Sequence, residues 1–295
     1  MNDRGKAPGS AAAAEPVEKG GIGSALKGML SFFTVFRLNI GMKEMDAMER
    51  KFGLAPILGF LIGFLTFLVC LVLRYAQAGW LLCAAVALVM PLLLSKFLHF
   101  DGLTDFGDGM IVSSGKREDH IRALKDTLIG AGGFGVALTV TLISFCGYAS
   151  MVSVVIAFTV WPVEVLTKNA MVIAAACGKP GNGMAARQVS RTGGRTAAVS
   201  LGLSVLLLAA VLLICRQLAL SCGWCMVPVD LDRAIILYAA AFLASSVTGL
   251  LMARTANRTF GFVNGDILGA TNEVSRAVML AVCSILTGLM MSGVI

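Results

Sequence analysis

The sequence predicts an all-α polytopic membrane protein with about seven transmembrane helices and an N-terminal interfacial helix. Of its 295 residues, 57% are hydrophobic and 14% are charged, and its mean hydropathy of +0.85 far exceeds that of soluble domains. Charge-free runs also recur at lengths near the ~20 residues that one span needs. They cover 52–73, 79–95, 127–163, 197–215, 234–253 and 277–295, and the run at 127–163 holds two spans. A soluble class is excluded.

The N-terminal region differs in composition from the rest of the chain. Residues 1–23 are rich in Ala, Gly, Pro and charge and lack the apolar core of a signal peptide, which predicts a disordered cytoplasmic tail. Residues 24–295 then form a single transmembrane domain. Its first apolar cluster, Leu26 to Phe36, is too short to span and is flanked by Lys27 and Arg37. We therefore expect an interfacial helix there.

Basic residues predict the topology. The 24 Lys and Arg against 17 Asp and Glu suggest nucleic-acid binding in a soluble protein, but here they lie between the apolar runs. Eight precede residue 52, five lie in 96–126, four in 179–196 and three in 254–276, against three in the other connections. Because cytoplasmic loops retain Lys and Arg, these four segments are expected inside. This predicts a multi-pass protein of a bacterial or archaeal plasma membrane, with its N-terminus inside and its C-terminus outside.

The predicted topology depends on residues 164–178. Glu164 and Lys168 are four apart, so on a helix they can neutralise each other, and we expect this stretch to prolong the fourth helix. If it formed a separate span, every downstream loop would change sides. The eight-span alternative is disfavoured because it places the later arginines outside.

Three aspartates follow the second span in HFDGLTDFGDGM, residues 99–110. Asp101, Asp105 and Asp108 share one helical face, where they repel one another unless a cation lies between them. Oxygen ligands of this kind suit Mg²⁺ or Mn²⁺, which in turn binds phosphates. A solvated acidic face is the alternative, but the apolar neighbours predict partial burial, which is costly for an unpaired carboxylate.

A fourth carboxylate, Asp126, precedes the glycine-rich start of the third span, where Gly130 and its neighbours permit close helix packing or ligand approach. Before it lie four basic residues suited to phosphate oxygens, although each also serves as a membrane anchor. They are Lys116, Arg117, Arg122 and Lys125.

A second polar cluster, NGDILGATNE, covers residues 264–273 ahead of the last span. Asp266 and Glu273 share one helical face, and Gly265 and Gly269 permit close approach. Both acidic clusters are expected on the cytoplasmic side. Two remote acidic clusters that converge on one face are what a two-metal phosphoryl-transfer site requires. The metal candidates are Asp101, Asp105, Asp108, Asp126, Asp266 and Glu273; the cofactor-binding candidates are Gly265, Gly269 and the four basic residues.

His99, Asp101 and Asp126 are the candidate catalytic residues. Neutral imidazole is the usual general base near pH 7, but on a continuous helix His99 would point away from the aspartates. A histidine hydrogen-bonded at the membrane interface is therefore the favoured interpretation of His99. His120 is expected in a loop.

Together these motifs resemble the adenosylcobinamide-GDP ribazoletransferase family, also called cobalamin synthase. The family pattern H-x-D-G-x-x-D-x-x-D-G matches residues 99–109, D-x-x-x-G matches 126–130, and G-D-x-L-G-A-x-x-E matches 265–273. The similarity covers most of the chain from about Phe33 onward. One departure is Arg276, where members often carry an acidic residue.

The resemblance implies that 24–295 is a catalytic domain that joins adenosylcobinamide-GDP to α-ribazole, or to its 5′-phosphate. The products would be adenosylcobalamin, or its 5′-phosphate, and GMP, with Mg²⁺ or Mn²⁺ as cofactor. The implied partners are these substrates and the lipid bilayer, without nucleic acid, and a homo-oligomer is left open.

Three other functional classes are alternatives to this one: a lipid enzyme, a transporter and a scaffold. The sequence matches the CDP-alcohol phosphotransferase signature at Asp105, Asp108, Gly109 and Asp126, and this makes a lipid enzyme of that type an alternative. It departs from the signature at the last aspartate, where it has Gly130. A transporter would place acidic residues at mid-membrane depth, and a scaffold would leave their clustering unexplained. Cys222 and Cys225 form a C-x-x-C in loop 216–233, a weak signal that is interpreted as two free thiols.

Overall fold

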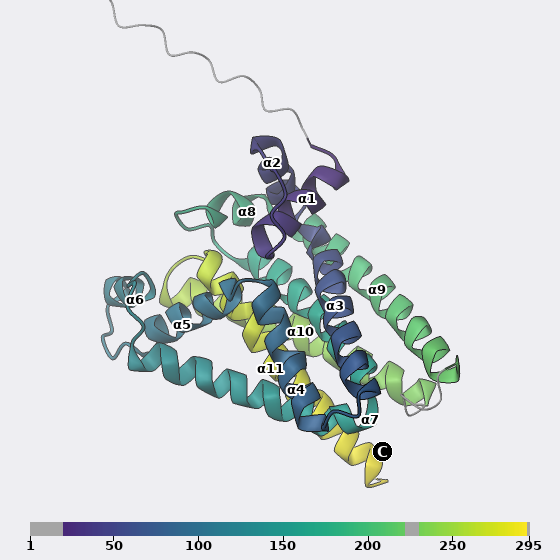
Figure 1. Ribbon diagram of the computed structural model, residues 1–295. Coiled ribbons are helices and arrows are strands. Elements are labelled where there is room, and N and C mark those ends of the chain that lie inside the picture. Colours follow the sequence, from purple (N-terminus) through teal and green to yellow (C-terminus); the bar gives the residue numbers. More distant parts are fainter. Residues whose placement is uncertain (1–19, 222–229, 294–295) are drawn as a thin grey trace, which may run out of the picture.

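A computed structural model describes residues 20–221 and 230–293, with only the backbone for 151–158 and 219, and its regular elements are helices (Figure 1). This confirms the predicted all-α class. The elements are α1 (Ile22–Phe33), α2 (Met42–Arg50), a 3₁₀ turn (Phe52–Leu54), α3 (Ala55–Tyr75), α4 (Trp80–Leu94), α5 (Leu98–Ile111), α6 (Arg117–Leu124), α7 (Ala131–Cys177), α8 (Ala185–Arg191), α9 (Gly194–Ser221), α10 (Leu231–Thr259) and α11 (Gly265–Met291).

The number of spans agrees with the sequence. In the described part of the chain, six helical segments are long and apolar enough to cross a membrane. A seventh span is supplied by α4 and α5 if they count together, although they are bent by 92° at their junction. The six are Phe52–Tyr75, Ala131–Ser150, Thr159–Cys177, Gly194–Leu218, Leu231–Thr259 and Gly265–Met291.

Two span boundaries differ from the prediction. The run at 127–163 does not hold both of its spans, because the second is Thr159–Cys177. The last span begins at Gly265 and not at residue 277. In both places the added residues include charged side chains that are buried, such as Glu164 and Arg276. Hydropathy treats such residues as exposed to lipid, whereas here other helices cover them.

The long element α7 doubles back. A straight helix of its 47 residues would extend about 70 Å. Ser150 instead accepts a hydrogen bond from Ser284 in α11, whereas Glu164 contacts Arg276, earlier in α11. The part of α7 after residue 158 therefore returns along α11, and 164–178 prolongs the same element, as predicted.

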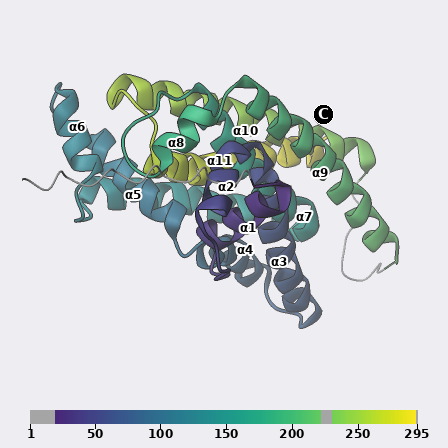
Figure 2. The same cartoon turned by 90° about the horizontal axis from the view of Figure 1, so that it is seen from above.

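One face of the bundle gathers the four basic-rich segments. Arg191 in α8 forms an ion pair with Asp46 in α2 at 2.8 Å, and the Lys179 amide donates to Asn257 at 2.9 Å. Arg117 donates to the Arg258 carbonyl at 3.2 Å. Viewed from above, α1, α2 and α8 lie over this end of the bundle (Figure 2). We call it the basic face; it comprises 20–51, 96–130, 178–194 and 257–266.

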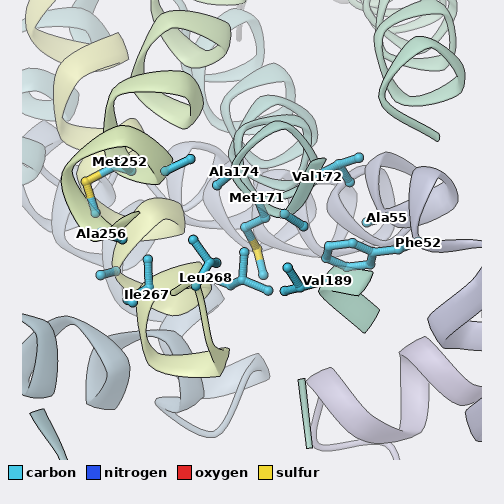
Figure 3. Close-up of a cluster of buried hydrophobic side chains, with 14 of the residues drawn as sticks. Phe52, Ala55, Met171, Val172, Ala174, Val189, Met252, Ala256, Ile267 and Leu268 are labelled. Atoms are coloured by element: carbon cyan, nitrogen blue, oxygen red, sulfur yellow. The ribbon is translucent and has the colours of Figure 1, made fainter. Parts of the chain in front are cut away.

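The interior has two apolar clusters. One surrounds Trp161, whose ring stacks on Phe67 with centroids 5.6 Å apart. The other lies beneath the basic face and joins α3, α7, α8, α10 and α11 through residues such as Met171, Ala256 and Leu268 (Figure 3). Large apolar side chains such as Leu206 and Ile285 point outward instead, as expected of a surface that faces lipid.

The N-terminal helix differs in extent from its prediction. It spans Ile22–Phe33, so it begins inside the predicted tail of 1–23 and ends before Phe36. Residues 1–19 of that tail lie outside the described residues, as do Cys222 and Cys225.

Candidate functional site

The break between α4 and α5 positions the first acidic motif. Lys96 and Phe97 adopt left-handed backbone conformations, with φ of 55° and 57°, which cost roughly 1–2 kcal/mol each for residues with a side chain. They end α4 and turn the chain before α5 begins at Leu98. As a result, α5 carries the motif from His99 to Asp108 across the basic face.

Carboxylates from α5 and α11 converge at this face. Asp101, Asp108 and Asp266 all lie near enough to Asp105 to repel its charge. The two helices touch at Gly102, where a Cβ atom would lie 2.6 Å from the Asp266 carbonyl oxygen. The structure therefore brings three aspartates of the first motif together with the first carboxylate of the second.

Asp108 is also bound by the start of α7. Its Oδ2 accepts the Gly130 amide and its Oδ1 accepts the Gly133 amide, both at 2.7 Å. A carboxylate here satisfies unpaired amides and interacts favourably with the helix dipole. A Cβ atom at Gly133 would lie 2.5 Å from the Thr104 carbonyl oxygen. This glycine therefore serves close packing of α7 on α5.

Glu273 and Asp126 lie in different surroundings. Glu273 is buried, with Oε2 paired to Arg276 and Oε1 accepting from Asn272 at 2.9 Å. Asp126 is exposed between α6 and α7, and its Oδ1 accepts the Leu128 amide at 3.0 Å. Neither is among the groups that act on the charge of Asp105.

The four predicted basic residues are exposed on or beside α6. Arg122 forms an ion pair with Asp119 at 2.6 Å, and Lys116 lies just before the helix. Lys125 lies 6.0 Å from the centre of the Phe262 ring and near enough to Asp266 to attract its charge. Lys125 is thus the one of the four whose charge acts on Asp266.

His120 lies in α6 and not in a loop, which corrects the prediction. Its Nδ1 is 2.7 Å from the Gly109 carbonyl oxygen and its Nε2 is 2.9 Å from the Ser114 carbonyl oxygen. The polar end of α5 and the following turn thereby hold the ring, and the sequence offered no sign of these partners.

His99 is buried, and its ring stacks on Phe33 with the centroids 6.1 Å apart. Its Nε2 is buried and has no hydrogen-bond partner. Gly269 allows α11 to pack here, since a Cβ atom at that position would lie 3.1 Å from the His99 carbonyl oxygen. His99 lines the same cavity as Asp101 and Asp266.

The donor chemistry of this cluster suits a hard cation. In the described part of the chain, Asp101, Asp105 and Asp266 form no ion pair, so three carboxylates share one region without a balancing salt bridge. Oxygen donors of this type are those preferred by Mg²⁺ and Mn²⁺. Among the described residues, no three acidic, histidine or cysteine side chains form a ready-made metal site.

A buried ionic cluster beneath the site was only partly indicated by the sequence. Lys168 Nζ lies 3.8 Å from Glu164 Oε2 and donates to Asn272 at 2.6 Å, so the predicted i,i+4 pair exists. Glu164 also accepts a shorter hydrogen bond from Arg276, which lies 112 residues away in the sequence. No local pattern indicated that pairing.

A second unpredicted cluster joins α2 to α8. Glu49 is buried and forms ion pairs with Arg187 at 3.0 Å and Arg191 at 2.9 Å. Next to it, the hydrogen bond from Arg50, assisted by Arg191, lowers the pKa of Asp46. These pairs hold α2 and α8 together over the site.

Comparison with known proteins assigns this arrangement to a family. Residues 25–284 match the cobalamin-5-phosphate synthase family. The chain belongs to that family. The match includes α5, the start of α7 and most of α11, so it covers every acidic motif described above.

Several relatives are similar over nearly their whole length, and each is named adenosylcobinamide-GDP ribazoletransferase. The chain is 26% identical to that of Methanosarcina mazei, over 91% of this chain and 94% of the relative. It is 29% identical to that of Methanocella arvoryzae, over 89% and 96%, and 29% identical to that of Prosthecochloris aestuarii, over 83% and 92%. No solved structure matches the chain.

The predicted resemblance is thereby confirmed. This member of the cobalamin-5-phosphate synthase family is a multi-pass membrane transferase of cobalamin synthesis. The family assignment favours the enzyme over the transporter, the scaffold and the CDP-alcohol lipid enzyme.

Proposed function

We propose that the chain joins adenosylcobinamide-GDP to α-ribazole, or to its 5′-phosphate, and releases GMP. A ribose hydroxyl of the ribazole attacks the phosphorus bonded to the cobinamide, the bond from that phosphorus to the GMP oxygen breaks, and the hydroxyl proton passes to a base. The observation that carries this proposal is the convergence of carboxylates from α5 and α11 beside a cavity. A diphosphate substrate requires positive charge beside it, and a cation held by these carboxylates would provide that charge.

We propose Mg²⁺ or Mn²⁺ as the cofactor, with Asp101, Asp105 and Asp266 as the preferred ligands. These side chains share one region and form no ion pair with a described residue, although Asp266 accepts a hydrogen bond from the Asn264 side chain at 2.6 Å. Asp108 and Asp126 are instead bound by backbone amides, and Glu273 is bound by Asn272 and Arg276. A bound cation would supply positive charge to the diphosphate oxygens.

The remaining polar groups have separate tasks in this proposal. Lys125 extends positive charge toward the aspartates and attracts the diphosphate. His99 and Asp101 border the cavity and are the candidate acceptors of the hydroxyl proton. Asp108 positions α5 by binding the start of α7.

We further propose that the basic face is cytoplasmic, in a bacterial or archaeal plasma membrane. Support comes from the ion pairs and hydrogen bonds that join the basic-rich segments on one face. Retention of Lys and Arg on the inner side of the membrane gives that face its orientation.

The direct test is turnover by the purified full chain in liposomes. Adenosylcobinamide-GDP and α-ribazole 5′-phosphate are supplied with Mg²⁺, and GMP and adenosylcobalamin 5′-phosphate are measured by mass spectrometry. We expect equimolar products from the native chain and at least about a hundredfold less from Asp105→Asn. Absence of both products, or transfer from a CDP-alcohol lipid instead, would overturn the proposal.

A further inference from the structure

A cavity of about 260 Å³ lies directly beside the acidic cluster. It is bounded by α1, α2, α5, α8 and the start of α11. Met171 and Leu268, which belong to the apolar cluster beneath the basic face (Figure 3), also line it. Asp101 and Asp266 belong to its wall. A molecule held in this cavity would therefore meet the carboxylates at one end.

The wall of the cavity is largely apolar and adaptable. Phe32, Phe33, Met45, Met48 and Met171 contribute to it. Aromatic and methionine side chains make favourable contacts with flat rings and adjust to their outline. This composition suits an apolar aromatic group better than a sugar or a phosphate.

Two polar side chains in this wall have unsatisfied groups. His99 is 2% exposed and Gln188 is 4% exposed, both line the cavity, and Nε2 of each is buried with no hydrogen-bond partner. Leaving such a group unpaired costs roughly 1–3 kcal/mol. A ligand that offers one or two hydrogen-bonding atoms within an otherwise apolar outline would recover this cost.

We infer that the cavity binds the nucleoside acceptor through its flat, apolar, nitrogen-containing base, with the ribose directed toward Asp101 and Asp266. This inference rests on the proposed function, because it assigns one of the two proposed substrates to a place. The benzimidazole base of ribazole has one unsubstituted ring nitrogen, which accepts a single hydrogen bond. His99 or Gln188 can supply that donor.

The other parts of the substrates fit the cavity less well. Pockets for drug-sized ligands have volumes of about 300–1,000 Å³, so a cavity of about 260 Å³ has no room for a corrin ring with its side chains. Guanine needs several polar partners. Of the polar side chains in this wall, Glu49 is already bound by Arg187 and Arg191, and Asn264 is bound by Asp266 and the Ile267 amide.

The test fills the cavity from its rim and measures each substrate separately. Ala185 of α8 lines the cavity and Ala186 does not, so Ala185→Leu and Ala186→Leu form a matched pair. With the other substrate saturating, we expect Ala185→Leu to raise the KM for ribazole at least tenfold, and the KM for adenosylcobinamide-GDP to change less than twofold. Ala186→Leu should leave both KM values within twofold of the native ones.

A second variant tests the unsatisfied amide of Gln188. Gln188→Leu keeps the approximate volume and removes the hydrogen-bonding group. We expect it to weaken binding of ribazole alone, measured by equilibrium dialysis, by about threefold to tenfold, with unchanged binding of adenosylcobinamide-GDP and a melting temperature near the native one. This binding readout needs no turnover.

The outcomes separate this inference from the proposed function. If the native chain forms no cobalamin product, the proposed function fails, and selective loss of ribazole binding in Ala185→Leu would still support the assignment of the cavity. If the native chain turns over and Ala185→Leu raises only the KM for adenosylcobinamide-GDP, the cavity takes the guanine nucleotide and the inference is wrong. Unchanged KM values for both substrates in Ala185→Leu would equally overturn it.

Discussion

Arg276 of α11 donates hydrogen bonds from Nε and Nη2 to Oε1 of Glu164 in α7, at 3.0 Å and 2.9 Å. Both side chains are almost fully buried. Arg276 also pairs with Glu273, and Lys168 lies beside Glu164. The two acids and two bases balance in formal charge, which lets a membrane protein keep four ionisable groups beneath its site.

Removing one charge of this cluster should lower the stability more than removing an acid and a base together. Arg276→Gln or Glu164→Gln alone leaves an uncompensated buried charge, and we expect each to lower the free energy of unfolding by about 3–5 kcal/mol. The double variant restores neutrality and should lose less than the sum of the two. Melting temperatures in detergent measure this, with the exposed Arg254→Gln as control. Additive losses would show that the pair does not act as a unit.

Asp105→Asn should stabilise the chain in the absence of metal while lowering activity at least about a hundredfold. Three carboxylates repel Asp105, so removing its charge relieves repulsion, and we expect a gain of about 1 kcal/mol, equivalent to about 2 °C in Tm. Added Mg²⁺ should raise the Tm of the native chain but not that of the variant. An equal response to Mg²⁺ in both would contradict the role of Asp105 as a ligand.

Asp108→Asn should have the opposite effect on stability and lower it. An amide keeps only one acceptor oxygen, so one of the two amides at the start of α7 loses its partner and the interaction with the helix dipole disappears. We expect a loss of about 1 kcal/mol in stability, together with reduced activity. Comparison of the melting curves of Asp105→Asn and Asp108→Asn checks the difference in sign. A higher Tm for Asp108→Asn would refute its capping role.

Gly102→Ala tests the contact between α5 and α11. The added Cβ would lie 2.6 Å from the Asp266 carbonyl oxygen and 2.8 Å from its Cα, and because both are backbone atoms the helices must separate. We expect at least a tenfold loss of turnover, measured as GMP release. Gly202→Ala in α9 is the control, since no neighbouring segment lies within 4 Å of its added Cβ. Full activity of Gly102→Ala would mean that the site does not depend on this close approach.

The orientation of the basic face is tested by labelling introduced cysteines in a cysteine-free variant. Ser190→Cys in α8 should resist an impermeant thiol reagent in intact cells and react after permeabilisation, because α8 lies on the face assigned to the cytoplasm. Asp232→Cys, at the opposite end of the bundle, should react from outside. Labelling of position 190 in intact cells would reverse the assigned orientation.

The sequence by itself determined the class of the protein and its approximate number of spans. Apolar run length and the distribution of Lys and Arg are local properties, and each directly reflects the cost of placing residues in lipid. The aspartates at 101, 105 and 108 were likewise identifiable, because their helical spacing places them on one face whatever surrounds them.

Only the tertiary structure decided which polar groups meet. The charge-free runs stop before Glu164 and start after Arg276, and this misplaced two span boundaries, since a run of residues cannot include a partner 112 residues away. The binding of Asp108 by the start of α7 and the cavity beside His99 also depend on contacts between distant segments. The stability of a buried polar group depends on its partners in space, and the local sequence does not specify them.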